Sequence, residues 1–444
     1  MKAYTTFSQG KRSILRILEI FSVVFSLFVL IRMFMVTKSE FHAMIPLVAI
    51  FDFAQVIPFG IELYSGLPNI PYKNFLIAME DKKTTQIFVL FIIAVQLVFL
   101  YEIERINKAI KKGQHQTTIV EFVQKVVNSK YRPLLIMLCY IAFLYVIAGI
   151  MMSPDPSIYL DIKQYDPVYY YAMRQRASLL AVATILLKLL DTNHNFFFWI
   201  SRLVFIIVAT LVDKKRTLLM IVVGMCFIID YVSNRNSNKR LLIKYTIIFG
   251  LTAWYFVFYA NYIGKTGNDW YYTLNEYIFR DMHLRFTIYA ALNPTQIHIL
   301  DYPGQSVLFN LFWWIPRALW KSKPRPFYEY YISGVLGYGT NSYDSIGWSM
   351  PASYFTEFVS NFGILGLVIG AWFTIWMARF FERRDLLCKL LGISLISILE
   401  IYYYDDAMKI LALVVLVLYL MEKVHIENRG YGLVLGIGKR KIND

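Results

Sequence analysis

Polar side chains recur at helical spacing late in the chain, in a stretch that is otherwise aromatic and branched apolar. Their spacing of i, i+4, i+7 and i+8 places them on one face of a helix entered at Pro351; they are Ser353, Glu357, Ser360 and Asn361. Glu357 lies six residues into this helix, or about 9 Å at about 1.5 Å per residue. A carboxylate near the edge of a membrane is costly unless it is paired or faces water. We therefore expect Glu357 to line an outward-facing cavity as a general base. An ion pair with an arginine such as Arg317 is the structural alternative.

A second group of side chains has the chemistry needed to bind a diphosphate. When a bond from carbon to pyrophosphate breaks, negative charge builds on the departing oxygen, and guanidinium or ammonium groups stabilise it. Arginine suits this task because its fork meets phosphate bidentately. The candidate cations are Lys214, Lys215, Arg216, Arg280, Arg285, Arg317, Lys323 and Arg325. For residues 214–216 the alternative is a helix-end cluster that extends to lipid phosphates.

Aromatic residues accompany these cations and offer flat faces and hydrogen-bonding tips for sugar rings. The candidates for sugar binding are Trp313, Trp314, Trp320 and Tyr330, together with Asn361. An interfacial aromatic belt is the alternative for the rings. His283, between Arg280 and Arg285, is the second candidate for the general base, and an ordinary buried histidine is an equally good reading of it.

Metal and cofactor sites leave little trace in the sequence. No zinc-ligand spacing, glycine-rich phosphate loop or metal-binding carboxylate pair occurs, so we expect no metal and no cofactor. The acids Glu400, Asp405 and Asp406 lie close together in the sequence, and a cation site formed by them is the alternative.

Composition then sets the class of protein that must position these residues. The chain has 444 residues, of which 57% are hydrophobic and 17% charged, and its mean hydropathy is +0.48. A soluble core cannot hide this much apolar surface, so the sequence predicts a polytopic membrane protein. The formal net charge of +15 comes from Lys and Arg between apolar runs, which is typical of cytoplasmic loops beside anionic lipid and not of a nucleic-acid partner.

Apolar runs of about 20 residues predict an all-α bundle of eleven or twelve membrane spans. Those that can be delimited are roughly 14–36, 43–60, 85–101, 133–152, 177–193, 196–212, 216–232, 241–263, 351–380, 386–402 and 408–421. Eleven spans put the N-terminus outside, whereas its lysines and arginines favour the inside, so one more span or a re-entrant segment is needed near residues 62–84. Gly366 and Gly370 fit a small-xxx-small packing pattern, and Asp52 with Gln55 predicts a buried polar network.

The spans divide the chain into three parts. Residues 1–263 form the N-terminal membrane helices, with an amphipathic cytoplasmic segment at 102–132. Residues 264–350 form a large insert between two late helices, and residues 351–444 form the C-terminal helices and a cytoplasmic tail. Basic residues in segment 102–132 mark the inner face, and counting helices onward from there places the insert outside.

Five short stretches together resemble Wzy-type oligosaccharide repeat-unit polymerases, which serve O-antigen, capsule and exopolysaccharide synthesis and are related to O-antigen ligases. They are Arg285-Phe, Pro303-Gly-Gln-Ser, Ile315-Pro-Arg-Ala-Leu-Trp-Lys-Ser-Lys-Pro324, Ser353 to Glu357, and Asn361-Phe-Gly-Ile-Leu-Gly366. The resemblance covers about residues 280–370, and the basic run at 214–216 is similar to a basic site of these enzymes. It implies a GT-C-like, metal-independent, inverting glycosyltransferase of the bacterial cytoplasmic membrane.

Such an enzyme would transfer a glycan from undecaprenyl pyrophosphate to a newly flipped lipid-linked repeat unit. Its expected partners are membrane lipid, a flippase and a chain-length regulator. The resemblance assigns pyrophosphate to Arg216, Arg280, Arg285 and Arg317, and the acceptor hydroxyl to Glu357. Related ligases use a loop histidine, which keeps His283 and His298 as candidates. Two alternatives stay open: an O-antigen-type ligase, and a transporter or flippase of the lipid-linked glycan.

Overall fold

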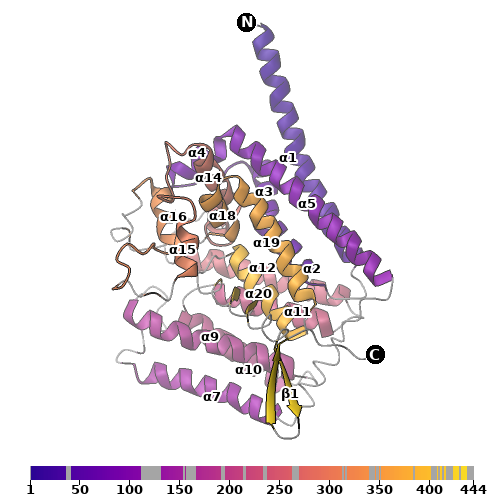
Figure 1. Cartoon of the computed structure of the whole chain (residues 1–444), viewed down its shortest axis with the longest axis vertical. Helices are drawn as coiled ribbons and strands as arrows, with labels where there is room; N and C mark the ends of the chain where they lie inside the picture. The colour runs from indigo at the N-terminus through magenta and orange to yellow at the C-terminus, as the bar shows by residue number, and fades with distance from the viewer. Residues whose placement is uncertain are drawn as a thin grey trace.

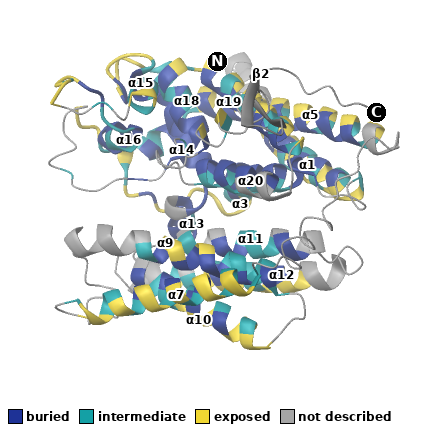
Figure 2. Ribbon diagram, turned by 60° about the horizontal axis from the view of Figure 1, so that its bottom comes forward, coloured by how far each residue is buried: buried dark blue, intermediate teal, exposed yellow. Residues whose placement is uncertain are grey.

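The computed structural model of the chain describes residues 2–36, 42–111, 132–153, 156, 167–191, 196–213, 217–233, 238–262, 270–312, 315, 318–339, 346, 350, 352–383, 386–401, 408, 411–412, 415–416, 424–429 and 432–437. Helices dominate this part of the chain. They lie in two groups, one above the other in Figure 2, with the short helix α13 (Trp270–Tyr277) between them.

The first group includes α1 (Lys2–Val36), which extends beyond the other helices at the top of Figure 1. Its other helices are α2 (Met44–Phe51), the π-helix η1 (Asp52–Val56), α3 (Ile57–Ser65), α4 (Lys73–Glu80), α5 (Lys82–Lys111), α14 (Asp281–Leu292), α15 (Gln305–Leu311), α16 (Phe327–Leu336), α18 (Tyr354–Phe362), α19 (Leu365–Glu382) and α20 (Leu386–Ile401). The second group consists of α7 (Arg132–Met151), α9 (Pro167–Leu190), α10 (Phe196–Asp213), α11 (Thr217–Ser233) and α12 (Asn238–Tyr262). A C-terminal hairpin pairs β1 (Val424–Arg429) antiparallel to β2 (Gly432–Ile437), with Val424 opposite Ile437.

Five helical segments are long and apolar enough to cross a membrane: Leu15–Val36, Met44–Ser65, Lys82–Lys108, Arg132–Met151 and Leu365–Glu382. Large apolar side chains face outward along them, including Ile20 and Phe28 on α1 and Leu365 and Trp372 on α19. Such surfaces are stable only against lipid. The described residues therefore confirm a helical membrane protein, while the total of eleven or twelve spans and the GT-C-like arrangement stay predictions.

The predicted single span over residues 351–380 is wrong. Helix α18 ends at Phe362, and Gly363 then takes a φ of +60°, a value that glycine reaches without steric cost. The chain turns back there, so α18 packs antiparallel on α19: the ring of Tyr354 lies against Phe373, and its hydroxyl contacts Thr374. This helical hairpin replaces the straight helix that hydropathy alone predicts.

Glycine makes the close contact between α18 and α19 possible. A Cβ atom on Gly366 would lie 2.2 Å from the carbonyl oxygen of Phe358, and one on Gly370 would lie 2.4 Å from the ring of Phe355. Both distances are far below van der Waals contact. The small-xxx-small pattern is thus confirmed as a packing surface, and its partner is the neighbouring α18.

Helix α14 occupies the centre of the first group. All its residues from Asp281 to Ala290 are buried, and it packs against α4, α5 and α18. Phe75 of α4 meets the rings of both Phe286 and His283 on α14. The insert at 264–350 thus supplies a core element of the bundle as well as connecting segments.

Charged side chains gather where α1, α5 and α19 end together. Arg32 pairs with Glu104, and the buried carboxylate of Glu102 receives both Arg105 and Arg379. The sequence predicts that this end of the helices faces the cytoplasm. Helix α5 continues to Lys111, beyond the predicted span end at residue 101, and residues 112–131 of the predicted amphipathic segment lie outside the described residues.

Candidate functional site

The polar face predicted on α18 meets the insert at α15. The hydroxyl of Ser306 donates to Oε1 of Glu357 at 2.6 Å, and Nδ2 of Asn310 donates to the same oxygen at 3.2 Å. Nδ2 of Asn361 donates to Ser306 Oγ at 2.7 Å and to the backbone carbonyl of Glu357 at 2.8 Å. Two donors on one oxygen suit an ionised carboxylate. The structure therefore assembles Glu357 and Asn361 into one cluster with Ser306 and Asn310.

Local sequence explains why Glu357 sits where it does. Ser353 is the N-cap of α18, and it forms a capping box with Thr356: each hydroxyl accepts a hydrogen bond from the other residue's backbone N–H, both at 3.3 Å. Glu357 follows in the first turn, where the positive end of the helix dipole stabilises a carboxylate. Ser353, Glu357 and Asn361 are all buried, so the predicted polar face is confirmed. Its predicted opening to a cavity is not seen, because Glu357 is only 1% exposed.

The hydroxyl of Tyr330 holds the insert together. It accepts hydrogen bonds from the backbone N–H of Arg325 at 2.9 Å and from Nε2 of Gln305 at 3.1 Å, which joins α16 to the start of α15. Burial raises the pKa of this hydroxyl. Tyr330 is itself 4% exposed, so its ring packs within the protein and the predicted sugar-binding role remains a prediction.

The other described insert residues also make internal contacts. Nζ of Lys323 donates to the carbonyl of Ile315 at 2.8 Å and lies over the ring of Phe309. Arg325 pairs with Glu329 one helical turn away at 3.3 Å. Trp320 is half-buried, and its indole N–H donates to Ser322. Lys323 and Arg325 lie in the segment that follows α15, as does the exposed Lys321.

Arg280 and Arg285 lie in the interior. The guanidinium of Arg285 makes a bidentate ion pair with Glu62, with Nη1 2.5 Å from Oε2 and Nη2 3.2 Å from Oε1. Nη2 also donates to the carbonyl of Met79 at 2.8 Å. The guanidinium of Arg280 donates to the carbonyls of Phe279 and Ile401. Both side chains are at most 1% exposed. To bind pyrophosphate either arginine would have to give up these partners, so that role stays a prediction for both.

Asp281, at the start of α14, shares the environment of Arg285. Burial and the neighbouring Glu62 raise the pKa of Asp281 to about 7. Arg285 opposes this shift, and its Nη1 lies 4.0 Å from the Asp281 carboxylate. Asp281 is not among the site residues predicted from the sequence.

His283 is a satisfied core histidine. Its Nε2 lies 3.3 Å from the carbonyl of Asn275 and 3.5 Å from Nη1 of Arg280, and its Nδ1 lies 2.8 Å from the hydroxyl of Tyr331. Burial and the charge of Arg280 hold the pKa of His283 well below its usual range. The ring is 0% exposed. This geometry favours the ordinary histidine over the second candidate base.

Several predicted site residues lie outside the described residues. They are Lys214, Lys215, Arg216, Trp313, Trp314 and Arg317, together with Asp405 and Asp406. Their proposed roles in binding pyrophosphate, sugar or a cation stay predictions.

Sequence reasoning missed the roles of Ser306 and Asn310. Both belong to α15, and Ser306 closes the Pro-Gly-Gln-Ser stretch from the sequence. Their spacing of four residues, which places both side chains on one face of a short helix, was the only sign in the sequence that they act together. Its meaning depends on Glu357, about fifty residues further along.

A buried polar network lies at the π-helix η1, as Asp52 and Gln55 predicted. Nε2 of Gln96 donates to Asp52 at 2.5 Å, and Nε2 of Gln55 donates to Glu400 at 3.3 Å. One carboxylate oxygen of Asp52 and one of Glu400 are buried with no hydrogen-bond partner among the described residues. These acids lie on different helices from Glu357 and form a second polar region.

Comparison of the chain with protein-family models, with curated proteins and with solved structures gives no match.

Proposed function

We propose that this protein is an integral-membrane glycosyltransferase that polymerises undecaprenyl-pyrophosphate-linked oligosaccharide repeat units at the outer face of the bacterial cytoplasmic membrane. One observation supports it above the others: Ser306, Asn310 and Asn361 converge on Glu357 where the insert meets the α18–α19 hairpin. An ordered carboxylate at such a boundary is suited to receive a proton from a sugar hydroxyl.

In this proposal Glu357 takes the proton of the acceptor hydroxyl. The acceptor oxygen attacks the anomeric carbon of the growing chain from the face opposite the pyrophosphate. The bond from carbon to pyrophosphate breaks, and its electron pair leaves on the phosphate oxygen, which inverts the anomeric centre. Cations stabilise the charge that develops there; Lys323, Arg325, Arg317 and residues 214–216 are the candidates, while Arg280 and Arg285 keep their interior partners.

Helix α15 controls access to Glu357 in this proposal. It spans only residues Gln305–Leu311, and the residues at its end, Leu311 and Phe312, are exposed. A short helix with an exposed end can be displaced at modest cost. Such a displacement would carry Ser306 and Asn310 away from Glu357 and leave its carboxylate open to an acceptor hydroxyl.

Glu357→Gln tests this function. The amide keeps the size of the side chain and an oxygen that accepts from Ser306, but it cannot take a proton. We expect purified variant in proteoliposomes to bind lipid-linked repeat units within about threefold of the wild type and to lose about 100-fold or more in turnover, the usual scale of general-base catalysis. Product length on a gel is the readout.

The matched control is Glu80→Gln, which removes the charge of an exposed carboxylate at the end of α4. A ladder of repeat lengths from the wild type and from this control, but not from Glu357→Gln, is the expected result. A single transfer product would instead identify a ligase. Normal turnover by Glu357→Gln would show that the general base does not belong to this cluster.

A transporter of the lipid-linked glycan is the second candidate, and the polar network at η1 favours it. Buried acids within membrane helices often mark transport pathways, and broken helices accompany them; here Asp52 and Glu400 lie beside a π-helix, and α18–α19 is a hairpin. Movement of fluorescent lipid-linked oligosaccharide across protein-containing vesicles, without any change in glycan length, would support this candidate over the polymerase.

A further inference from the structure

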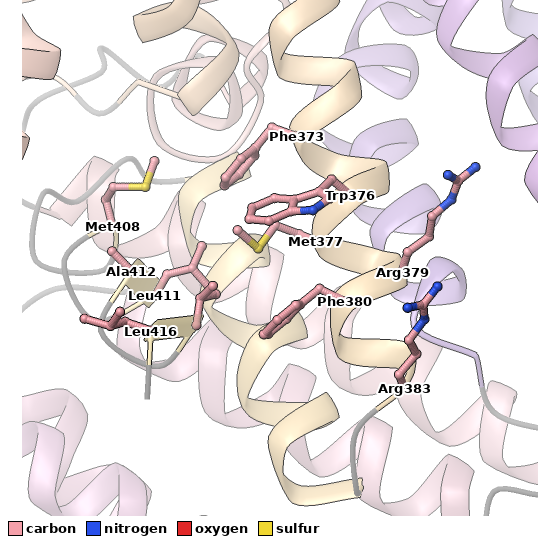
Figure 3. Close-up of a pocket in the computed structure, with 11 residues that line it drawn as sticks. Phe373, Trp376, Met377, Arg379, Phe380, Arg383, Met408, Leu411, Ala412 and Leu416 are labelled. Atoms are coloured by element: carbon pink, nitrogen blue, oxygen red, sulfur yellow. The ribbon is translucent and has the colours of Figure 1, made fainter. Parts of the chain in front are cut away.

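A groove of about 720 Å³ runs along the C-terminal half of α19 (Figure 3). This volume falls within the range of about 300–1,000 Å³ that holds small ligands. The groove lies between α19 and the described residues of 408–416. Its lining is largely apolar, with Phe373, Trp376, Met377 and Phe380 on one side and Leu411 and Val415 on the other.

Two arginines lie at the edge of this groove. Figure 3 shows the rings of Trp376 and Phe380 directed toward Leu411, and the guanidinium groups of Arg379 and Arg383 on the other flank of the same helix, about one turn apart. Arg383 is the C-cap of α19 and is exposed. Its guanidinium is directed away from the apolar lining in Figure 3, but an exposed arginine at a helix end has a long, flexible side chain that can extend to a headgroup at the rim.

Positive charge exceeds negative charge at this edge. Arg379 shares the buried carboxylate of Glu102 with Arg105. Arg383 makes no ion pair with any described residue of the chain. Two further pairs at the same helix ends, Arg32 with Glu104 and Lys389 with Glu382, are balanced in charge. The positive excess where the apolar lining ends is therefore that of three guanidinium groups, those of Arg105, Arg379 and Arg383, over the carboxylate of Glu102.

We propose that this groove binds one anionic phospholipid, with its acyl chains on the apolar lining and its phosphate at Arg383, supported by Arg379. The groove is apolar along its length and has arginines at one end, just as a phospholipid has apolar acyl chains and a charged headgroup at one end. The headgroup is anionic because the choline or ethanolamine of a zwitterionic lipid would bring a further cation to a site that already has an excess.

The lipid site is separate from the proposed polymerase site. Glu357 lies between Phe355 and Phe358, which pack beside Gly370 and Gly366 in the first half of α19. Arg383 follows Gly370 by 13 residues, or about 20 Å at about 1.5 Å per residue. A phosphate held at Arg383 is therefore too far from Glu357 for the two to share one headgroup. The proposal stands whether or not the protein is a glycosyltransferase.

Native mass spectrometry of the full-length protein, purified in detergent, tests the site. Phosphatidylglycerol and phosphatidylcholine with identical acyl chains are added together. We expect one retained lipid, with phosphatidylglycerol preferred, and Arg383→Gln should weaken its retention about fivefold, the effect of about 1 kcal/mol per basic residue at an anionic headgroup. Arg16→Gln is the control, because it removes one positive charge from an exposed position on α1 that does not line the groove.

A second measurement tests the position of the acyl chains. Phosphatidylglycerol with brominated chains quenches nearby indoles, so its quenching should fall in Trp376→Phe and stay unchanged in Trp254→Phe, whose exposed ring lies on α12 in the other group of helices. Equal retention of both phospholipids, unchanged retention in Arg383→Gln, or undiminished quenching in Trp376→Phe would each overturn the proposal. Preferential retention of undecaprenyl phosphate would overturn it as well, since the groove would then belong to a polyprenyl chain.

Discussion

At the scale of single residues, burial separates the charges that shape this protein from those available to a ligand. Arg285 and Glu62 form a bidentate pair beneath the rings of Phe59 and Phe88. The carboxylate of Glu357 is also buried, yet its partners are small neutral groups on a short helix. An ion pair of the first kind holds helices together, whereas the second arrangement leaves a carboxylate that can exchange one hydrogen-bond donor for another.

Arg285→Met tests the structural role of that pair. It leaves Glu62 largely buried without its cation, and removing one partner of a buried pair costs about 3–5 kcal/mol. We expect a large drop in the free energy of unfolding in detergent and a poor yield of inserted protein. The double variant Arg285→Met with Glu62→Leu should recover most of both, since apolar side chains of similar size can replace a buried pair.

Activity of the double variant then separates the two roles of Arg285. A folded double variant that still extends glycans would show that Arg285 acts through the fold. A folded but inactive one would support the pyrophosphate role, and failure of the double variant to recover stability would contradict the pairing argument.

At the scale of elements, the α18–α19 hairpin decides where the polar cluster lies. Hydropathy treats residues 351–380 as one long helix, because it averages over composition and carries no information on direction. The reversal at Gly363 depends on a positive φ, and the packing that follows depends on two missing Cβ atoms. The resulting contact places the polar face of α18 toward α15, while its aromatic face lies on α19.

Gly366→Ala should break this packing. The added methyl would approach the backbone of Phe358 within 2.2 Å, and backbone cannot move aside as a side chain can, so we expect a loss of about 1–3 kcal/mol. The midpoint of thermal unfolding in detergent is the measurement. Gly224→Ala in α11 is the control, because nothing lies within 4 Å of its added Cβ; there alanine should be neutral or stabilise the helix by about 0.5–1 kcal/mol. Equal behaviour of the two variants would contradict the hairpin contact.

At the scale of the whole molecule, the charged cluster at the ends of α1, α5 and α19 lies at the opposite end of α19 from the Glu357 cluster. The sequence predicts that the basic end faces the cytoplasm and the insert the outside. This arrangement would place a donor and an acceptor bearing exported glycans beside Glu357, and anionic inner-leaflet lipid beside Arg383.

Cysteine labelling in intact cells tests this orientation. Leu319→Cys, at an 81% exposed position in the insert, should react with a membrane-impermeant maleimide added outside. Lys108→Cys, at an exposed position near the end of α5, should react only after the membrane is permeabilised. Both are made in a variant without the native cysteines at 139, 226 and 388. The reverse pattern would invert the topology and place Glu357 on the cytoplasmic side.

The sequence by itself determined the class of protein, the polar face of α18, the glycine packing surface and the polar pair of Asp52 and Gln55. Each follows from local spacing or composition, which the chain carries in any fold. Only the tertiary structure decided that residues 351–380 reverse at Gly363, that Ser306 reaches Glu357, and that Arg280, Arg285 and His283 lie in the interior. Those outcomes depend on which distant segments pack together, and a charge has the same sequence signature whether its partner is Glu62 or a ligand.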